Sequence, residues 1–262
     1  MIVSPHPNLI EDRRDHLAVL RIDRVEYLGA LSRDMVAALE MYLTGIAEDP
    51  DVRALVITGT GRGFIAGADV REYHDANQRS FDSYQRLSRR TFDALEALRV
   101  PTIAAVNGFA FGGGFEVALC CDFVFASEAA LFALPEVLLG LLPGGGGSQR
   151  LSRAIGKRAA KELIMTGRRL NGEEARELGL LTRIVEGDAL MSSALEFAET
   201  LAQRAPLAVR EAKRLIDDGA ELPLQVGLTL EQRVLSALFA TQDGKEGILA
   251  FVEKRTPKFL GE

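Results

Sequence analysis

The sequence predicts an α/β fold in which helices cover a sheet, followed by a mainly helical C-terminal part. Two observations support this prediction. In the first half, short apolar runs alternate with longer segments in which apolar residues recur every three or four positions. Because the short runs lack a polar face, they are typical of strands covered on both sides by helices. From about residue 148 onward, helical segments follow one another and are separated mainly by Gly and Pro.

The individual elements follow from the same patterns. Residues 32–49 form the first predicted helix, with apolar side chains at helical spacing and Ser32 as its N-cap. Residues 81–99 form the second predicted helix, and residues 180–185 interrupt the helical second half as a strand. The strands predicted in the first half are 17–22, 54–59, 102–106 and 122–126.

The composition is that of a globular protein. With 262 residues, of which 47% are apolar, the chain can bury a sizeable core and is too apolar for disorder. We find neither a low-complexity linker nor an internal repeat, and we expect a core domain over residues 1–200 and a helical region over 201–262. The balance of 31 Lys and Arg against 37 Asp and Glu residues argues against a broad nucleic-acid-binding face.

The cysteines and the lengths of the apolar runs indicate the cellular compartment of the protein. Cys120 and Cys121 are adjacent in an apolar segment, and neighbours of this kind rarely bridge, so we expect reduced thiols. Residues 1–15 contain no apolar h-region of a secretory signal. No run of about 18 uncharged apolar residues exists that could span a membrane. We therefore expect a cytoplasmic protein with no membrane partner.

Glycines follow the predicted strand 54–59 in a way that suggests a dinucleotide-binding turn. Gly59, Gly61 and Gly63, however, have the spacing GxGxG rather than GxGxxG, and no ribose-binding acid stands at a second strand end. The pattern GxxxxGK[ST] of a phosphate-binding loop is also missing. These differences argue against a nucleotide cofactor.

A second glycine-rich segment, "NGFAFGGGFE" (107–116), stands between two apolar runs. If a helix starts at its glycines, their amides lie near the positive end of that helix and can bind an oxyanion without a side chain in the way. A glycine turn that lets a strand and a helix pack closely explains the same residues. The residues alone leave both interpretations open.

Two carboxyl groups are candidates for proton transfer, because Glu116 and Glu136 each stand among apolar residues. Burial disfavours the ionised form of a carboxyl and raises its pKa toward neutrality, as a general acid or base requires. For Glu136, which follows Pro135, an exposed loop position is the alternative. Glu116 has a similar ambiguity, although its setting offers few solvent-facing positions.

Four segments together resemble the crotonase family, whose members include enoyl-CoA hydratases and isomerases. The segments are "FIAGADV" (64–70), "NGFAFGGGFEVALCCD" (107–122), "FALPEVLLGLLPGGGGSQRL" (132–151) and "GKEGILAFVEKR" (244–255). Each is moderately specific, whereas all four in this order form a strong resemblance that covers the chain from about residue 17 to its end. The resemblance implies a spiral of ββα repeats with a helical C-terminal region used in trimer formation, and the trimers often pair into hexamers.

The resemblance also implies the site and the reaction. The backbone N–H groups of Ala68 and Gly113 would form an oxyanion hole, and Glu116 and Glu136 would be the catalytic carboxyls. The residues implied in substrate binding are Ala66, Asp69, Val70, Gly112 and Gly144. The implied reaction is syn addition of water to a 2-trans-enoyl-CoA, giving a 3-hydroxyacyl-CoA, with Glu116 acting on the water and Glu136 on carbon 2. CoA is part of the substrate, so neither a cofactor nor a metal is expected.

The chain departs from the family pattern at two places. Many relatives carry "NRP…NAL" near the first helix, where this chain has "DRVEYLGAL" (23–31), which affects the expected contacts with the CoA nucleotide. "PGGGG" (143–147) stands where "PGAGG" is more usual. Candidates for binding the CoA phosphates are Lys245, Lys254 and Lys258, for which a solvated helix face is the alternative.

Other functions stay open. Dehydration of a 3-hydroxyacyl-CoA or isomerisation of an enoyl-CoA fits the same family, although monofunctional isomerases usually keep only one of the two glutamates. A non-catalytic protein that binds RNA or acyl-CoA would use the arginines of residues 85–99. A metal-dependent enzyme is disfavoured, because His6, His16 and His74 lack ligand spacing. Acyl chain length and the pathway, fatty-acid metabolism included, are not readable from the residues.

Overall fold

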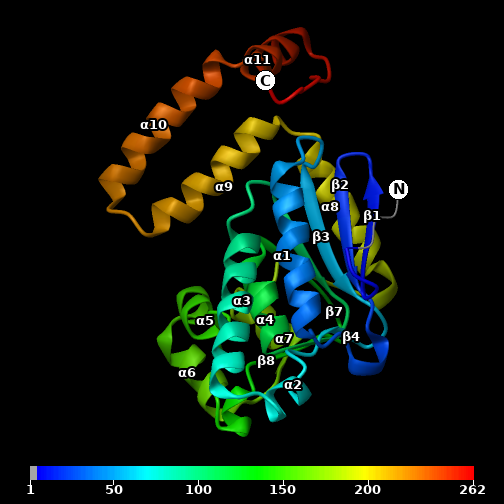
Figure 1. Cartoon of the computed structure of the whole chain (residues 1–262). Helices are drawn as coiled ribbons and strands as arrows, with labels where there is room; N and C mark the ends of the chain where they lie inside the picture. Colours follow the sequence, from blue (N-terminus) through cyan, green and yellow to red (C-terminus); the bar gives the residue numbers. More distant parts are fainter. Residues whose placement is uncertain (1–4) are drawn as a thin grey trace.

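The computed structural model describes residues 5–262, which form two sheets flanked by helices (Figure 1). Residues 1–4, part of the segment in which no secretory h-region is expected, lie outside the described residues. None of the helices in the described part combines the length and the hydropathy that a bilayer crossing requires.

The larger sheet has six strands in the order β1-β2-β3-β5-β7-β10. Their bounds are β1 (Leu9–Arg14), β2 (Leu17–Ile22), β3 (Ala54–Gly59), β5 (Thr102–Val106), β7 (Phe123–Ser127) and β10 (Arg183–Val185). β1 pairs with β2 in antiparallel fashion, and the other neighbours pair in parallel. Parallel neighbours need crossover connections, and helix α1 (Arg33–Glu48) provides the one from β2 to β3.

The smaller sheet has four strands in the order β4-β6-β8-β9. Their bounds are β4 (Gly63–Ile65), β6 (Phe109–Phe111), β8 (Leu131–Ala133) and β9 (Leu170–Asn171). β4, β6 and β8 each follow a strand of the larger sheet and precede a helical segment. The pairs β3–β4, β5–β6 and β7–β8 are thus successive turns of one coil, and the expected spiral of ββα units is confirmed.

The remaining helices cover the sheets or extend from them. They are α2 (Arg71–His74), α3 (Gln78–Glu96), α4 (Gly113–Cys120), α5 (Gly147–Ile155), α6 (Lys157–Thr166), α7 (Gly172–Glu177), α8 (Leu190–Ala202), α9 (Pro206–Ala220), α10 (Leu224–Ala240) and α11 (Gln242–Glu253). Three short 3-10 helices are η1 (Val25–Tyr27), η2 (Glu136–Leu139) and η3 (Gly187–Ala189).

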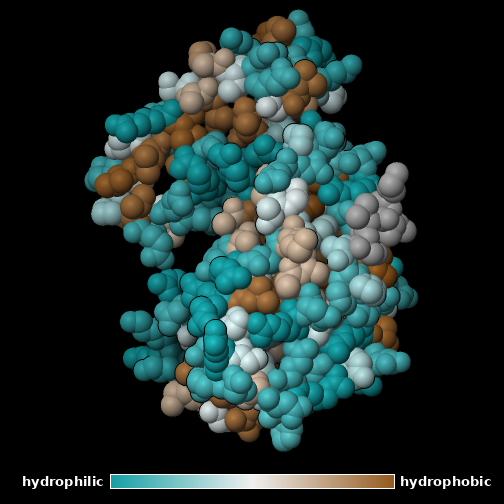
Figure 2. Space-filling model, in the orientation of Figure 1, coloured by the Kyte–Doolittle hydropathy of each residue, from teal (hydrophilic) through white to brown (hydrophobic). Residues whose placement is uncertain are grey.

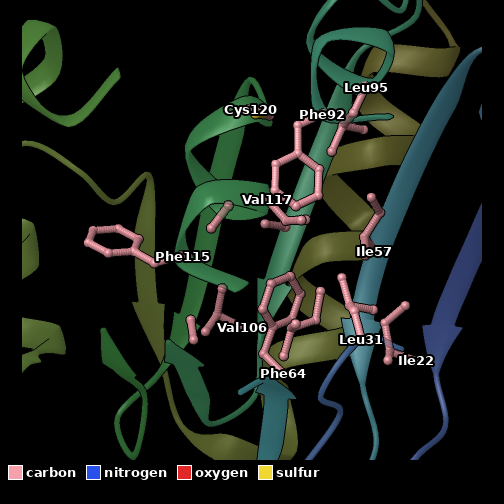
Figure 3. Packing of buried hydrophobic residues seen from close by; sticks show 14 of the residues in the cluster. Ile22, Leu31, Ile57, Phe64, Phe92, Leu95, Val106, Phe115, Val117 and Cys120 are labelled. Atoms are coloured by element: carbon pink, nitrogen blue, oxygen red, sulfur yellow. The ribbon is translucent and has the colours of Figure 1, made fainter. Parts of the chain in front are cut away.

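Helices bury both faces of the larger sheet. On one face, Leu190 and Ala194 of α8 share a buried cluster with Val56 of β3. On the other face, α1, α3 and α4 enclose the main core. Figure 3 shows Phe92 of α3 and Val117 of α4 within this core. Burial on both sides explains why the strands are uniformly apolar.

The last three helices, α9 to α11, extend away from the two sheets (Figure 1). α9 begins with Pro206, a position where a missing N–H leaves no helical hydrogen bond unmade. No residue of α10 is buried, and hydrophobic side chains gather along it on the molecular surface (Figure 2). Its large exposed apolar residues are Leu224, Val226, Leu228, Leu235 and Phe239. This apolar extension is the helical C-terminal region that the sequence predicts.

Most of the predicted strands are confirmed, and two differences have local causes. The predictions 17–22, 54–59 and 102–106 match β2, β3 and β5, and 122–126 begins one residue early. β1 was not predicted, because its charged residues obscure the strand pattern. The predicted strand 180–185 is wrong in its first three residues, because Leu180 N donates to Ala175 O (2.9 Å) and closes the end of α7.

The two predicted helices in the first half are confirmed with shifted ends. Ser32 occupies the N-cap position of α1, but its hydroxyl bonds to the Asp34 carboxylate instead of a backbone N–H. α3 begins at Gln78, three residues earlier than predicted, because Asn77 Oδ1 accepts a hydrogen bond from Ser80 N (2.9 Å) and caps the helix there.

Candidate active site

A cavity of about 650 Å³ lies where segments from three turns of the spiral meet. The residues that follow β4, β6 and β8 form one side of it, and α3 forms another. The sequence-predicted residues that line it are Ala66, Ala68, Val70, Gly112, Gly113, Glu116, Glu136 and Gly144. The structure therefore brings together residues up to 78 positions apart, and we call this space the active-site cavity.

The three consecutive glycines each have a separate structural reason. Gly112 has a φ of +50°, a conformation that glycine adopts readily. Gly113 is the first residue of α4, so its N–H has no acceptor within the helix and faces outward from the helix start. Gly114 packs against β4, where a Cβ would lie 2.7 Å from the Ile65 carbonyl carbon. The close-packing glycine turn thus accounts for Gly112 and Gly114, while the N–H of Gly113 is left as a donor at the helix start.

The second candidate oxyanion donor, Ala68, lies close to Gly113. A Cβ built on Gly113 would be 3.9 Å from Ala68 N. On either side of Ala68, Leu31 N donates to Gly67 O and Asp69 N donates to Leu31 O, both at 2.8 Å. In such a parallel bridge the N–H of the central residue points away from the bonded strand. The Ala68 N–H is therefore fixed in direction and left available to a ligand.

Asp69, which was expected to bind substrate, is not among the residues that line the cavity. It is buried, and its carboxylate accepts hydrogen bonds from Arg24 Nη2 (2.9 Å) and Arg71 Nε (2.8 Å). These bonds, first that of Arg71, lower the pKa of Asp69 to about 2. Both guanidinium groups also lie over the ring of Tyr27, at 4.4 and 4.1 Å from its centroid. Asp69 thus anchors the loop that carries Ala68.

Glu116 projects from the first turn of α4 and is 3% exposed. Its Oε1 accepts hydrogen bonds from the backbone N–H groups of Gly145 and Gly147, both at 2.8 Å. Burial raises the pKa of Glu116, and these two bonds act in the opposite direction. A Cβ at Gly145 would lie 2.7 Å from Glu116 Oε2, so the glycine-rich loop makes room for the carboxylate.

Glu136 is the first residue of η2, directly after Pro135, and it is half-buried. Its Oε2 is buried without a hydrogen-bond partner among residues 5–262, and its Oε1 would lie 3.0 Å from a Cβ on Gly112. Burial, followed by the charge of Glu116, raises the pKa of Glu136 to about 7. The expectation of a raised pKa is met, and an exposed loop position is excluded.

The arrangement suits acid–base chemistry beside a carbonyl group. The backbone of Ala68 and Gly113 and the carboxyls of Glu116 and Glu136 line the same, largely apolar cavity. One carboxyl is held in place by two amides, and the other changes protonation state near pH 7. Groups with such different environments can divide the roles of base and acid between them.

Several residues of the cavity were not singled out from the sequence. Phe92 of α3 lies against the glycine loop and α4, and Gln85 lies against Gly144. Tyr73, Tyr84 and Ser88 complete the wall from the same region. Tyr73 lies on α2, whereas the others share one face of α3, and the sequence alone does not say that this face lines a cavity.

The candidate phosphate-binding lysines lie elsewhere. Lys245, Lys254 and Lys258 are exposed, on α11 or beyond it, and none lines the active-site cavity of this chain.

His6 bonds to Asp34, and no group of three or more His, Cys, Asp or Glu side chains within residues 5–262 is arranged to hold a metal ion.

Comparisons with known proteins identify the family of this chain. The profile of the enoyl-CoA hydratase/isomerase family matches residues 12–262. The chain is 40% identical over 254 residues to a probable enoyl-CoA hydratase of Mycobacterium tuberculosis, covering 97% of this chain and 98% of that one. It is 38% identical over 258 residues to a crotonyl-CoA hydratase of Syntrophomonas wolfei, covering 98% and 99% of the two chains.

A solved structure shows the same fold. An enoyl-CoA hydratase from Bacillus anthracis superimposes with a TM-score of 0.95 at 40% identity, covering 97% of this chain and 100% of that one. The sequence match extends over nearly the whole chain. This chain belongs to the enoyl-CoA hydratase/isomerase family.

Proposed function

We propose that this chain is an enoyl-CoA hydratase, which adds water in syn fashion to a 2-trans-enoyl-CoA and forms a 3-hydroxyacyl-CoA. One observation carries the proposal. Glu116 and Glu136 line the same cavity as the N–H groups of Ala68 and Gly113, so that two carboxyls and two donors can act on one substrate. The presence of both glutamates favours hydration or dehydration over isomerisation.

The oxyanion hole would stabilise the negative charge that develops on the thioester oxygen during the addition of water. When water attacks carbon 3, the π electrons move toward the thioester oxygen, which becomes an enolate. The N–H groups of Ala68 and Gly113 would donate to this oxygen without reorganising. Removing one donor of this kind typically costs about 3 kcal/mol in the transition state.

The two carboxyls divide the proton transfers. Glu116 has Oε1 occupied by two amides, which leaves Oε2 to orient the water and accept its proton as the oxygen bonds to carbon 3. Glu136, whose pKa is about 7, donates a proton to carbon 2. Proton exchange with solvent then restores both groups. Each positioned proton transfer contributes about 10²–10⁴-fold to the rate.

The test follows the loss of the enoyl absorbance of crotonyl-CoA and of longer 2-enoyl-CoA thioesters. We expect Glu116→Gln and Glu136→Gln each to reduce kcat by at least 10²-fold. Glu173→Gln, a change on the exposed face of α7, serves as the matched control and should keep full activity. A loss of only a few-fold in both cavity variants would reject the assigned roles. An unchanged enoyl band with every acyl chain would reject hydration itself.

We also propose that the chain assembles as a trimer, or as a pair of trimers, through its C-terminal helices. α10 exposes a row of apolar side chains and buries none of its residues, which in an isolated chain would leave an extensive apolar surface in water. Its substrate partner would be an acyl-CoA thioester. The two free thiols, Cys120 and Cys121, support a cytoplasmic location.

A further inference from the structure

One face of α3 forms a wall of the active-site cavity. Phe92, Ser88, Gln85, Tyr84 and Phe81 lie on it at helical spacing, and all five line the cavity. Phe92 marks the catalytic end, because its ring lies 3.8 Å from a Cβ built on Gly113. With a rise of about 1.5 Å per residue, Ser88 lies about 6 Å and Tyr84 about 12 Å farther along the helix.

This wall fits the acyl part of the substrate better than the CoA part. Ser88 and Tyr84 are each 6% exposed, whereas Leu139 and Leu142, which also line the cavity, are each more than half exposed. The large, charged CoA moiety requires the open side of a cavity. The acyl group therefore extends along α3 into the buried side.

The buried side carries hydrogen-bonding groups that an alkyl chain cannot use. Ser88 Oγ is buried and has no hydrogen-bond partner among residues 5–262. Gln85 Nε2 donates to the Tyr73 hydroxyl at 3.4 Å, close to the limit for a hydrogen bond. Burial is the main cause that raises the pKa values of Tyr73 and Tyr84, so both phenols stay protonated at neutral pH. We call these four residues the polar cluster.

An alkyl tail would leave Ser88 Oγ without a hydrogen-bond partner in a dry space. A buried polar group that lacks a hydrogen bond weakens the complex, because its lost bonds to water are not replaced. The surrounding lining, with Phe81, Phe92 and Leu139, is apolar. A small polar group within an apolar wall is the usual way in which a pocket selects one oriented ligand.

We propose that the natural acyl group carries an oxygen atom, as a hydroxyl or a carbonyl, which forms hydrogen bonds with Ser88 and the rest of the polar cluster about one helical turn from the reacting carbons. This inference rests on the proposed function, because it takes the substrate to be an enoyl-CoA. It assigns Ser88 the main role in specificity, since its hydroxyl is free to donate. Tyr84 lies one turn of α3 from Ser88 and delimits the site.

The experiment compares matched substrates, trans-2-octenoyl-CoA and its 7-hydroxy and 7-oxo derivatives. For the wild type, we expect kcat/KM to favour at least one oxygenated thioester by about tenfold, which corresponds to one hydrogen bond to a buried group. In Ser88→Ala this preference should disappear, and the plain thioester should gain. Ser80→Ala, which changes an exposed serine of the same helix, should keep the wild-type preference.

A binding measurement keeps this inference separate from the proposed activity. Calorimetry with saturated octanoyl-CoA and 7-hydroxyoctanoyl-CoA should show the same preference and its loss in Ser88→Ala, whether or not hydration occurs. Equal or better affinity and turnover for the plain chain in the wild type would overturn the inference. A preference that persists in both Ser88→Ala and Tyr73→Phe would overturn it as well. Hydration of crotonyl-CoA would still stand in either case.

Discussion

The start of α4 offers a sharp test of the site architecture, through two alanine substitutions in adjacent glycines. At Gly114, a new Cβ would lie 2.7 Å from the carbonyl carbon and 2.8 Å from the Cβ of Ile65. Both contacts involve β4, which cannot rotate away as a flexible side chain would. At Gly113, the nearest atom to a new Cβ is Phe92 Cζ at 3.8 Å, an ordinary van der Waals contact.

The expected magnitudes differ accordingly. Gly114→Ala forces α4 away from β4, and such overpacking typically destabilises a protein by about 1–3 kcal/mol. For a chain of this size, that lowers Tm by roughly 2–4 °C per kcal/mol. Gly113→Ala should leave Tm within about 1 °C of the wild type. Its methyl group nevertheless enters the cavity near Ala68 N, so we expect kcat/KM to fall by at least tenfold.

The assay pairs thermal unfolding, followed by circular dichroism, with the hydration of crotonyl-CoA at a temperature well below the transitions. The wild type and Glu173→Gln provide the reference for both measurements. If Gly114→Ala unfolds at the wild-type temperature, the close packing of α4 on β4 is refuted. If Gly113→Ala is fully active, Gly113 does not border the reacting group.

Three further predictions concern the rest of the site and the C-terminal helices. Because the pKa of Glu136 is raised to about 7, its acidic form is present below this pH and is lost above it. We therefore expect kcat/KM to fall as the pH rises through 7, and a flat profile up to pH 9 would contradict the role of Glu136 as acid. Asp69→Asn removes a charge held by two arginines, so we expect kcat/KM to fall about tenfold with a loss of Tm, and unchanged kinetics would show that the Ala68 loop needs no anchor. Leu235→Asp and Phe239→Asp on α10 should reduce the mass measured by light scattering, whereas an unchanged assembly would exclude this face as an interface.

Asp69 also has a pH effect on stability that follows from its lowered pKa. The carboxylate is favoured in the folded chain, so its stabilising contribution is complete above the usual pKa of 3.8 and is lost as the pH falls toward 2. The stability difference between the wild type and Asp69→Asn should therefore be constant above about pH 4 and shrink as the pH falls toward 2.

The strands and the carboxyls were predictable from the sequence for a physical reason. β2, β3 and β5 are buried on both faces, which makes their apolar runs unambiguous. Glu116 and Glu136 stood out because charged residues are rare in such surroundings. Their convergence, by contrast, came only from the resemblance, since the residues that separate them carry no signal of how the chain turns.

The parts that the sequence did not predict depend on contacts between distant segments. Arg24 and Asp69 are 45 positions apart, and no local sequence pattern at either residue predicts their ion pair. In the sequence, Ser88 resembles any other serine of a helix. In the structure it is buried beside the cavity. The ββα repetition was expected only from the family resemblance, because successive turns share a backbone path while their side chains and lengths differ.

The repeated pairing of strands has a consequence for how such enzymes diversify. Ala68 follows β4, Gly113 and Glu116 follow β6, and Glu136 follows β8, so equivalent corners of three successive coils each contribute one part of the chemistry. The corners are tied together by the small sheet, whereas the cavity wall formed by α2 and α3 lies outside that sheet. Exchanges of side chains in that wall can therefore change which acyl groups the enzyme accepts while the reactive groups keep their positions, so substrate range can evolve independently of catalytic power.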